Sequence, residues 1–196
     1  MYIISYMKKG LLIILSGPSG VGKGTIRKYL MDNKDINLSF SISMTTRSPR
    51  NGEVDGVDYF FVSHEAFEEA VKKRKFLEHA RFVDNCYGTP KDYVEKLRNE
   101  GHNVLLEIET NGAKQVIKKT INDDGRISIF LIPPSLEELE RRIRGRQTEN
   151  EETIKKRLQK AKRELKKQSL YNYVVVNNTP EQAANEIIDI IKNKMI

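Results

Sequence analysis

Residues 11–30 read LLIILSGPSGVGKGTIRKYL, an apolar run that leads into a glycine-rich turn and then into a helical pattern. This order of strand, turn and helix is the context in which a glycine motif binds phosphate. The glycines allow positive φ and a close approach of backbone N–H groups, and the helix adds the positive end of its dipole. We therefore expect a phosphate-binding loop made of Gly17, Pro18, Ser19, Gly20, Val21, Gly22, Lys23, Gly24 and Thr25.

Lys23 is expected to reach the terminal phosphates of the ligand. The next position departs from the usual pattern, because Gly24 stands where a Ser or Thr hydroxyl normally binds Mg²⁺, and Thr25 comes one residue late. We infer that Mg²⁺ would be held mainly by phosphates and water, which this ion tolerates. An ordinary glycine-rich turn between a strand and a helix is the alternative interpretation.

The composition indicates one domain with insertions. A chain of 196 residues with 38% hydrophobic content can bury one sizeable core. The single cysteine, Cys86, excludes an internal disulfide framework and fits a reducing compartment, so a cytoplasmic location is expected. No apolar stretch approaches the roughly 18 residues that a membrane-spanning helix needs, and no membrane partner is expected.

The net charge of +7 first suggests a nucleic-acid partner. The excess lies in residues 155–167, which hold eight basic residues and one acidic residue, Glu164. Ile154, Leu158, Ala161 and Leu165 recur there with the period of a helix that buries one stripe. We favour a solvated basic face on a core helix over nucleic-acid binding, and a direct role of some of these charges in anion binding stays open.

Strand-like and helix-like patterns alternate along most of the chain. The expected strands are residues 11–15, 38–43, 59–62, 76–83, 104–108, 127–132 and 173–176. Such alternation indicates an α/β fold with a parallel sheet covered by helices on both faces. Residues 39–90 carry several short strands and a single helix, and they are interpreted as an insertion.

The polar loop of residues 44–58 contains Arg47 and Arg50, three residues apart and held by Pro49. Two arginines flanked by hydroxyl groups suit a second phosphate better than a protein core. Two solvent-facing loop residues remain the alternative from this pattern alone.

Together these segments resemble the guanylate kinase family over roughly residues 10–195. The resemblance rests on residues 16–25, on residues 45–50 with Gly52, Glu53 and Tyr59, on residues 87–89, and on Arg142, Arg146, Thr148 and Glu149. It implies a nucleoside monophosphate kinase with a P-loop core at about 8–38, 91–141 and 168–196. A GMP-binding insertion at about 39–90 and a mobile lid at about 142–157 would complete it.

The resemblance also implies roles for individual residues. ATP with Mg²⁺ and GMP would be the partners, and Glu107 would order Mg²⁺ through water. Lys23, Arg142, Arg146 and Arg157 would act on the transferring phosphoryl group. Arg47, Arg50, Tyr59 and Tyr87 would hold the GMP phosphate, and Ser43, Glu78, Thr89 and Glu109 would read guanine. The family commonly has aspartates where this chain has Glu107 and Glu109.

The chemistry of the acceptor agrees with these roles. Guanine presents two N–H donors that a carboxylate such as Glu78 accepts, which adenine does not offer. A monophosphate is already largely ionised at neutral pH, so no catalytic base is expected, and His64, His79 and His102 are interpreted as structural or surface residues.

Three other function classes are the alternatives. A GTPase needs an Asn-Lys-x-Asp motif, whereas the most similar segment, residues 33–36, has its aspartate at the third position instead of the fourth. A non-catalytic guanylate-kinase-like module that binds a phosphopeptide would have no reason to keep Lys23 and the lid arginines. An RNA-binding protein, suggested by charge alone, would show a steep salt dependence of RNA affinity.

Overall fold

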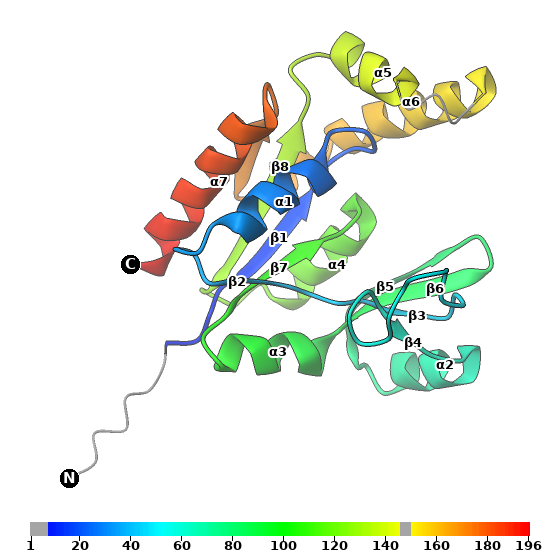
Figure 1. Ribbon diagram of the computed structural model, residues 1–196, viewed down its shortest axis with the longest axis vertical. Coiled ribbons are helices and arrows are strands. Elements are labelled where there is room, and N and C mark those ends of the chain that lie inside the picture. Colours follow the sequence, from blue (N-terminus) through cyan, green and yellow to red (C-terminus); the bar gives the residue numbers. More distant parts are fainter. Residues whose placement is uncertain (1–7, 146–149) are drawn as a thin grey trace.

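A parallel five-stranded sheet forms the centre of the computed structural model, which describes residues 8–145 and 150–196. The strand order is β2 (Leu38–Phe40), β7 (Asn103–Glu107), β1 (Leu12–Ser16), β8 (Arg126–Ile132) and β9 (Tyr173–Val176). All pairs in this sheet are parallel, with Ile13 of β1 opposite Leu105 and Ile127. Helices cover both faces of the sheet (Figure 1).

The sequence of β1 explains why both faces are covered. Ile13 and Leu15 pack with residues of α1 (Lys23–Asp32) and α7 (Pro180–Met195). Leu12 and Ile14 point to the other face and pack with residues of α3 (Lys91–Asn99) and α4 (Thr110–Lys119). A strand that is apolar at every position must be buried on both sides. The expected α/β fold with a doubly covered parallel sheet is confirmed.

A second, mixed sheet lies beside this core. Its order is β4 (Phe60–Phe61), β3 (Met44–Thr45), β6 (Asn85–Pro90) and β5 (Phe76–Phe82). Helix α2 (His64–Lys72) covers it through Phe67, whose ring stacks on Phe76 with centroids 4.6 Å apart. Figure 1 shows this sheet and α2 at one end of the molecule.

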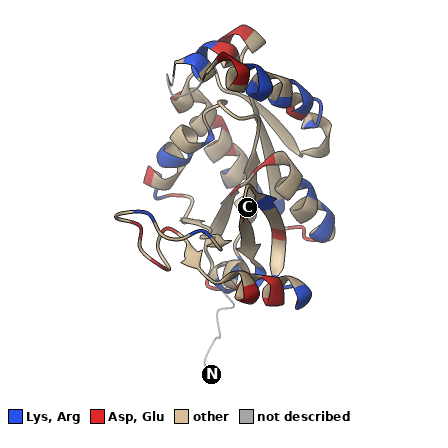
Figure 2. Cartoon of the chain, turned by 90° about the vertical axis from the view of Figure 1, so that its right-hand side faces the viewer, with Lys and Arg blue, Asp and Glu red and all other residues tan. Residues whose placement is uncertain are grey.

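The other end is formed by α5 (Leu136–Arg144) and α6 (Glu151–Leu165), which is followed by a short 3₁₀ helix at Gln168–Leu170. Leu139, Ile143, Ile154 and Ala161 form a small core between α5 and α6. Figure 2 shows basic and acidic residues along these two helices. Lys155, Lys156, Lys162, Arg163 and Lys166 are exposed, which fits the solvated basic face expected for residues 155–167.

Two strands were missed from the sequence. Met44–Thr45 lies in the segment expected as a loop, and no strand was expected at Asn85–Pro90. Gly88 hid the second strand, because glycine usually marks a turn. Here a Cβ at Gly88 would lie 2.8 Å from Cδ1 of Phe76, so the glycine is a packing requirement inside a strand. The strand expected at 38–43 ends at Phe40.

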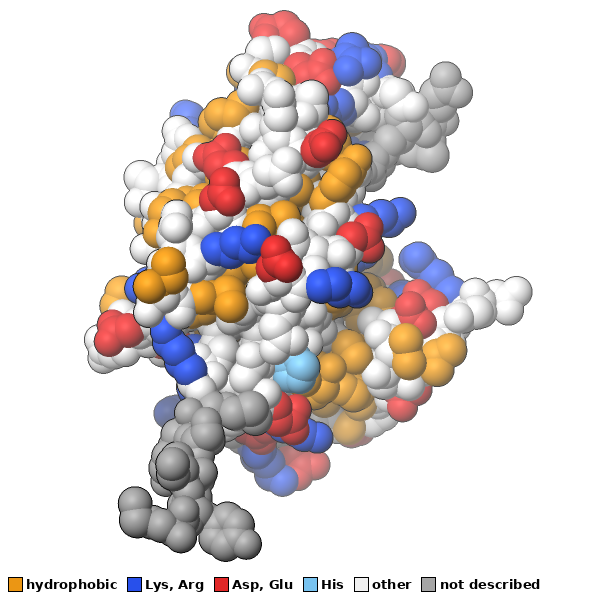
Figure 3. Space-filling model, turned by 60° about the vertical axis from the view of Figure 1, so that its left-hand side comes forward, with side chains coloured by type: hydrophobic (Ala, Val, Ile, Leu, Met, Phe, Trp, Pro, Cys, Tyr) orange, Lys and Arg blue, Asp and Glu red, His pale blue; other side chains and the backbone are white. Residues whose placement is uncertain are grey.

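On the face drawn in Figure 3, apolar side chains lie in several separate groups among charged ones. Within the described ranges 8–145 and 150–196, no helix combines the length and the apolar character needed to cross a membrane.

Candidate functional site

The glycine loop joins the end of β1 to the start of α1. Gly22 is the residue before the helix and has φ +102°, a left-handed conformation that favours glycine. A Cβ there would lie 2.6 Å from Nδ2 of Asn177, which donates a hydrogen bond of 2.7 Å to the carbonyl of Val21. Asn177 directly follows β9, so a neighbouring segment at the same edge of the sheet fastens the loop.

Lys23 turns its side chain back into this loop. Its Nζ donates hydrogen bonds to the carbonyl oxygens of Gly17, at 2.8 Å, and Pro18, at 3.1 Å. Burial lowers the pKa of the ammonium group, while Glu107 and Glu164 act in the opposite direction. The loop borders a cavity of about 400 Å³. Its lining includes Ser19, Lys23, Gly24, Arg27 and Glu107.

Two of the expected arginines reach the loop from α5 and α6. Nη2 of Arg142 on α5 donates to the carbonyl of Asn177 at 3.0 Å, and its Nε contacts Glu138 at 2.7 Å. Nη2 of Arg157 on α6 donates to Oγ of Ser19 at 2.7 Å. Arg146 lies outside the described residues. Nη1 of Arg142 also donates to the carbonyl of Val21 at 3.4 Å, so both guanidinium groups contact residues of the expected phosphate-binding loop.

The acidic residues after β7 lie apart from each other. Oε2 of Glu107 is 3.3 Å from Nη1 of Arg27, and this buried oxygen has no hydrogen-bond partner among the described residues. Oε1 of Glu107 is the nearest group to Gly24, 4.0 Å from where a Cβ would stand. Glu109 instead contacts Lys160 of α6 at 2.9 Å and is 66% exposed. Glu109 thus faces helix α6.

A second cluster forms around Arg47 in the loop before β4. Nη2 of Arg47 contacts Oε1 of Glu53 at 2.8 Å, and the backbone N–H of Arg50 donates to the other oxygen of Glu53, also at 2.8 Å. The Arg47 guanidinium lies 5.4 Å from the ring centre of Tyr59, which is 6.3 Å from the ring of Tyr87. Hydrogen bonding to Arg47 lowers the pKa of Glu53. The structure therefore brings Arg47, Tyr59 and Tyr87 together, and it joins Arg50 to this cluster through its backbone N–H on Glu53.

The role of Glu53 as the partner of Arg47 was not predicted from the sequence, where Glu53 was only part of a motif. Its position six residues after Arg47 in the same loop could have indicated this role, because an acid there can orient the arginine.

Glu78 on β5 is a buried carboxylate. Its Oε1 accepts a hydrogen bond of 2.7 Å from Oγ1 of Thr89, its cross-strand neighbour on β6. Its Oε2 lies against α4, where a Cβ at Gly112 would stand only 2.7 Å away. Burial raises the pKa of Glu78, and the hydrogen bond from Thr89 and the charge of Lys119 oppose this effect.

A cavity of about 440 Å³ separates this cluster from the glycine loop. Ser43 and Tyr59 line it on one side, and Arg27 and Glu107 line it on the other. Arg27 and Glu107 also line the cavity at the loop, so the two cavities meet at this ion pair.

Sequence reasoning missed Arg27, although it lies one helical turn after Lys23 on the same helix and so shares its face. It also missed Glu164, a buried acid of α6 that accepts a hydrogen bond of 3.4 Å from Thr110. Nothing in the sequence separates Glu164 from the charged residues around it except its place beside the apolar stripe.

Comparison with known proteins gives consistent matches. The model of the family described as guanylate kinase matches residues 9–194. A guanylate kinase of Mesoplasma florum is 54% identical over 93% of this chain and 61% of that protein, and one of Mycoplasma capricolum is 53% identical over 94% and 61%. The chain thus spans about three fifths of the length of these relatives. The crystal structure of guanylate kinase from Anaplasma phagocytophilum is 33% identical, with a TM-score of 0.72 over 95% of this chain and 87% of that one.

The buried carboxylate of Glu78 leads to a prediction about stability. Because burial raises its pKa, the folded protein keeps a proton that the unfolded chain has already lost. Stability therefore falls as pH rises from the ordinary value of 4.5 towards the raised pKa, and the cost remains at higher pH. We expect Glu78→Gln to raise Tm near pH 8 by about 2–4 °C for each kcal/mol recovered.

This gain should disappear below about pH 4, where the carboxyl is protonated in both states. Thermal unfolding followed by circular dichroism between these limits measures it, and the exposed Glu186→Gln on α7 is the matched control. Parallel pH profiles for Glu78→Gln and the parent protein would contradict the assignment of a buried charge.

Proposed function

Because the chain belongs to the guanylate kinase family, we propose that it transfers the γ-phosphoryl group of ATP to GMP, and likewise to dGMP, to give ADP and the nucleoside diphosphate. The proposal keeps the division expected from the sequence into a P-loop core, a GMP-binding insertion and a lid.

One observation carries the proposal, namely that two cavities, each beside a cluster expected to bind an anion, share one ion pair. The cavity at the glycine loop and the cavity at Tyr59 share Arg27 and Glu107. A phosphoryl donor on one side and a phosphorylated acceptor on the other would therefore face each other across this pair. A GTPase or an ATPase needs only the first of these clusters.

The donor side consists of residues 17–25, with the loop fastened by Asn177. Glu107 fits the role of ordering Mg²⁺ through water, because its buried oxygen has no hydrogen-bond partner among the described residues and its other oxygen faces Gly24. Mg²⁺, when bound with ATP, neutralises charge on the β- and γ-phosphates. The phosphates and water would supply its remaining ligands, since Gly24 offers no hydroxyl.

The acceptor side combines charge with base recognition. Arg47, Arg50, Tyr59 and Tyr87 would hold the phosphate of GMP, with Glu53 fixing the fork of Arg47. Glu78 and Thr89, together with Ser43, would read guanine. Because Glu78 is buried, an unpaired carboxylate beside the wrong base would cost about 1–3 kcal/mol. Glu109 is the weakest member of this set, since it contacts Lys160 on the other side of the loop.

Catalysis would consist of positioning and charge compensation. The acceptor oxygen is already ionised at neutral pH, so the main obstacle is repulsion between two anions. Lys23, Arg142 and Arg157 converge on the loop and would stabilise the transferring group, and Arg146 is proposed to join them. Cations in this position can contribute about 10³–10⁵ in rate.

The direct test is ADP release from ATP and Mg²⁺ with one acceptor at a time. We expect turnover with GMP and dGMP and at most about 1% of that rate with AMP or UMP, because several buried polar groups read the base. A coupled spectrophotometric assay measures the ADP. The absence of ADP in the presence of GMP would refute the proposed reaction.

Lys23 provides a test of the two-site arrangement. Lys23→Ala should lower kcat by at least about a thousandfold, because its charge acts on the transferring group. The dissociation constant of GMP, measured by calorimetry, should change less than about threefold, since GMP is expected to bind at Arg47. Lys34→Ala, in the exposed turn after α1, is the matched control. Loss of GMP binding in Lys23→Ala would mean that the two sites have been misplaced.

Glu78 should determine which base is accepted. Glu78→Gln places an N–H group where guanine presents its own donors, so the ratio of kcat/KM for GMP to that for AMP should fall at least about tenfold. ATP affinity should stay the same. An unchanged GMP-to-AMP ratio would remove Glu78 from the base-reading set.

A further inference from the structure

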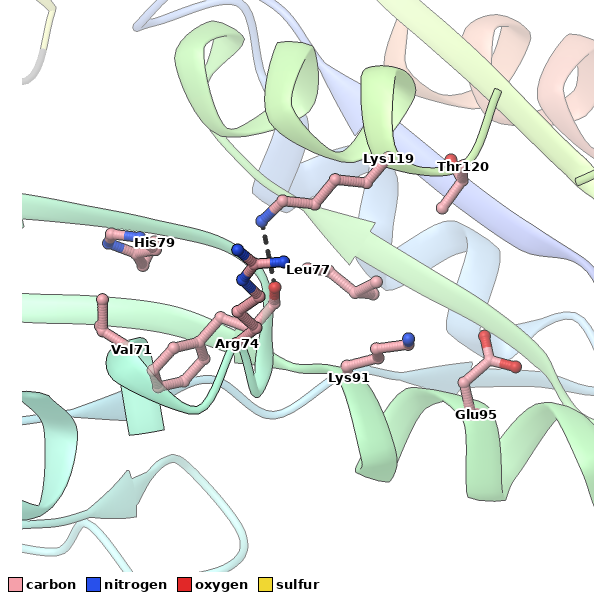
Figure 4. Close-up of a pocket in the computed structure, with 9 residues that line it drawn as sticks. Val71, Arg74, Leu77, His79, Lys91, Glu95, Lys119 and Thr120 are labelled. Carbon is pink, nitrogen blue, oxygen red and sulfur yellow. Dashed lines mark hydrogen bonds between the residues drawn. The ribbon is translucent and has the colours of Figure 1, made fainter. Parts of the chain in front are cut away.

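A separate cavity of about 560 Å³ lies where the second sheet meets the core (Figure 4). Its walls come from the end of α2, from β5, from α3 and from the end of α4. Phe76 and Leu77 of β5 give it an apolar floor. None of its lining residues belongs to the proposed ATP or GMP sites.

The rim of this cavity carries an excess of positive charge. Arg74, Lys91 and Lys119 line it together with one acid, Glu95. Glu95 is already engaged, because its Oε2 contacts Lys9 at 2.5 Å and its Oε1 contacts Arg98 at 3.0 Å. Over residues 8–145 and 150–196, no ion pair joins an acidic side chain to any of the three rim cations.

Two of these cations line the same cavity from different elements. In Figure 4 the side chains of Arg74 and Lys119 point toward one another. Nζ of Lys119 donates a hydrogen bond of 3.1 Å to the carbonyl of Phe76, which fixes its position. An anion bound between the two cations would be attracted by both.

The backbone holds Arg74 in this position at a cost. Arg74 ends the turn after α2 with φ +53°, a left-handed conformation that favours glycine, and its N–H donates to the carbonyl of Val71. A residue with a Cβ costs roughly 1–2 kcal/mol there. The chain thus carries a guanidinium at a position where helix termination alone would select glycine.

We propose that the cavity bounded by Arg74, Lys91 and Lys119 is a binding site for a small organic phosphate. The phosphate group would lie between the guanidinium and the ammonium groups, and the organic part would pack on Phe76 and Leu77. Arg74 supplies a planar fork of donors that matches phosphate, and the lysines supply point charges. The site stands independently of the proposed function, although β5 carries Glu78 two residues beyond Phe76.

The test uses phenyl phosphate and inorganic phosphate as probes. Each is titrated at constant ionic strength into protein saturated with GMP and ADP, which occupy the proposed substrate sites, and amide shifts are followed by NMR. We expect saturable shifts at residues 74–79 and 117–120. Phenyl phosphate should bind several-fold more tightly than inorganic phosphate, because only the ester reaches the apolar floor.

Arg74→Gly removes the charge and should leave the fold intact, because glycine is favoured at φ +53°. It should weaken phenyl phosphate binding at least about tenfold, as should Lys119→Gln, because each removes a charge-assisted hydrogen bond. Lys118→Gln, next to Lys119 but outside the cavity lining, should leave the affinity unchanged.

Equal affinity in the parent protein and in Arg74→Gly would overturn the proposal, and so would shifts that fail to saturate. Failure of the proposed substrate sites gives a different result from failure of this phosphate site. It would appear as absent shifts at residues 17–25 and 43–59 when GMP and ADP are added.

Discussion

The parallel pairing of β1 between β7 and β8 is the constraint on which the rest of the molecule depends. Because β1 is buried on both faces, its register with its neighbours is fixed, and the ends of all three strands meet at one edge. The glycine loop and Glu107 emerge at that edge. Asn177 joins them from β9, where its backbone N–H donates to the carbonyl of Ile132 at 2.8 Å. The position of the candidate phosphate site thus follows from the register of the sheet before any side chain is considered.

The sequence predicted those parts of the structure that local patterns determine. The glycine loop, the buried strands and the amphipathic helices each carry their own signal. The missed features depend on contacts between distant segments. Gly88 is a strand residue only because Phe76 packs against it, and Arg27 belongs to the site only because β7 brings Glu107 alongside α1. Residue type alone predicted a phosphate for Arg47 and a base for Glu78, but it could not show that Glu109 turns towards Lys160.

The two sides of the site bury opposite charges. At the loop, Lys23 is partly buried against backbone carbonyls, and burial lowers its pKa although acids nearby act in the opposite direction. At β5, Glu78 is buried with a hydroxyl donor, and burial raises its pKa. Burial thus disfavours the charged form of both groups, a cost that an uncharged side chain would avoid. Such a local conflict between stability and residue choice is typical of a site that recognises a ligand with donors of its own.

Strand β5 contacts helix α4 on the side away from Thr89. Glu78 lies between Thr89 and α4, and the carbonyl of Phe76, two residues earlier, accepts a hydrogen bond from Lys119 at the cavity bounded by Arg74, Lys91 and Lys119. Helix α4 holds this strand through the close approach of Gly112 to Glu78, through Lys119, and through two hydrogen bonds between Gln115 and the backbone of His79. Lys119 also acts on Glu78 through its charge, which opposes the rise in pKa that burial causes. Helix α4 therefore contributes both to the position of β5 and to the ionisation of Glu78.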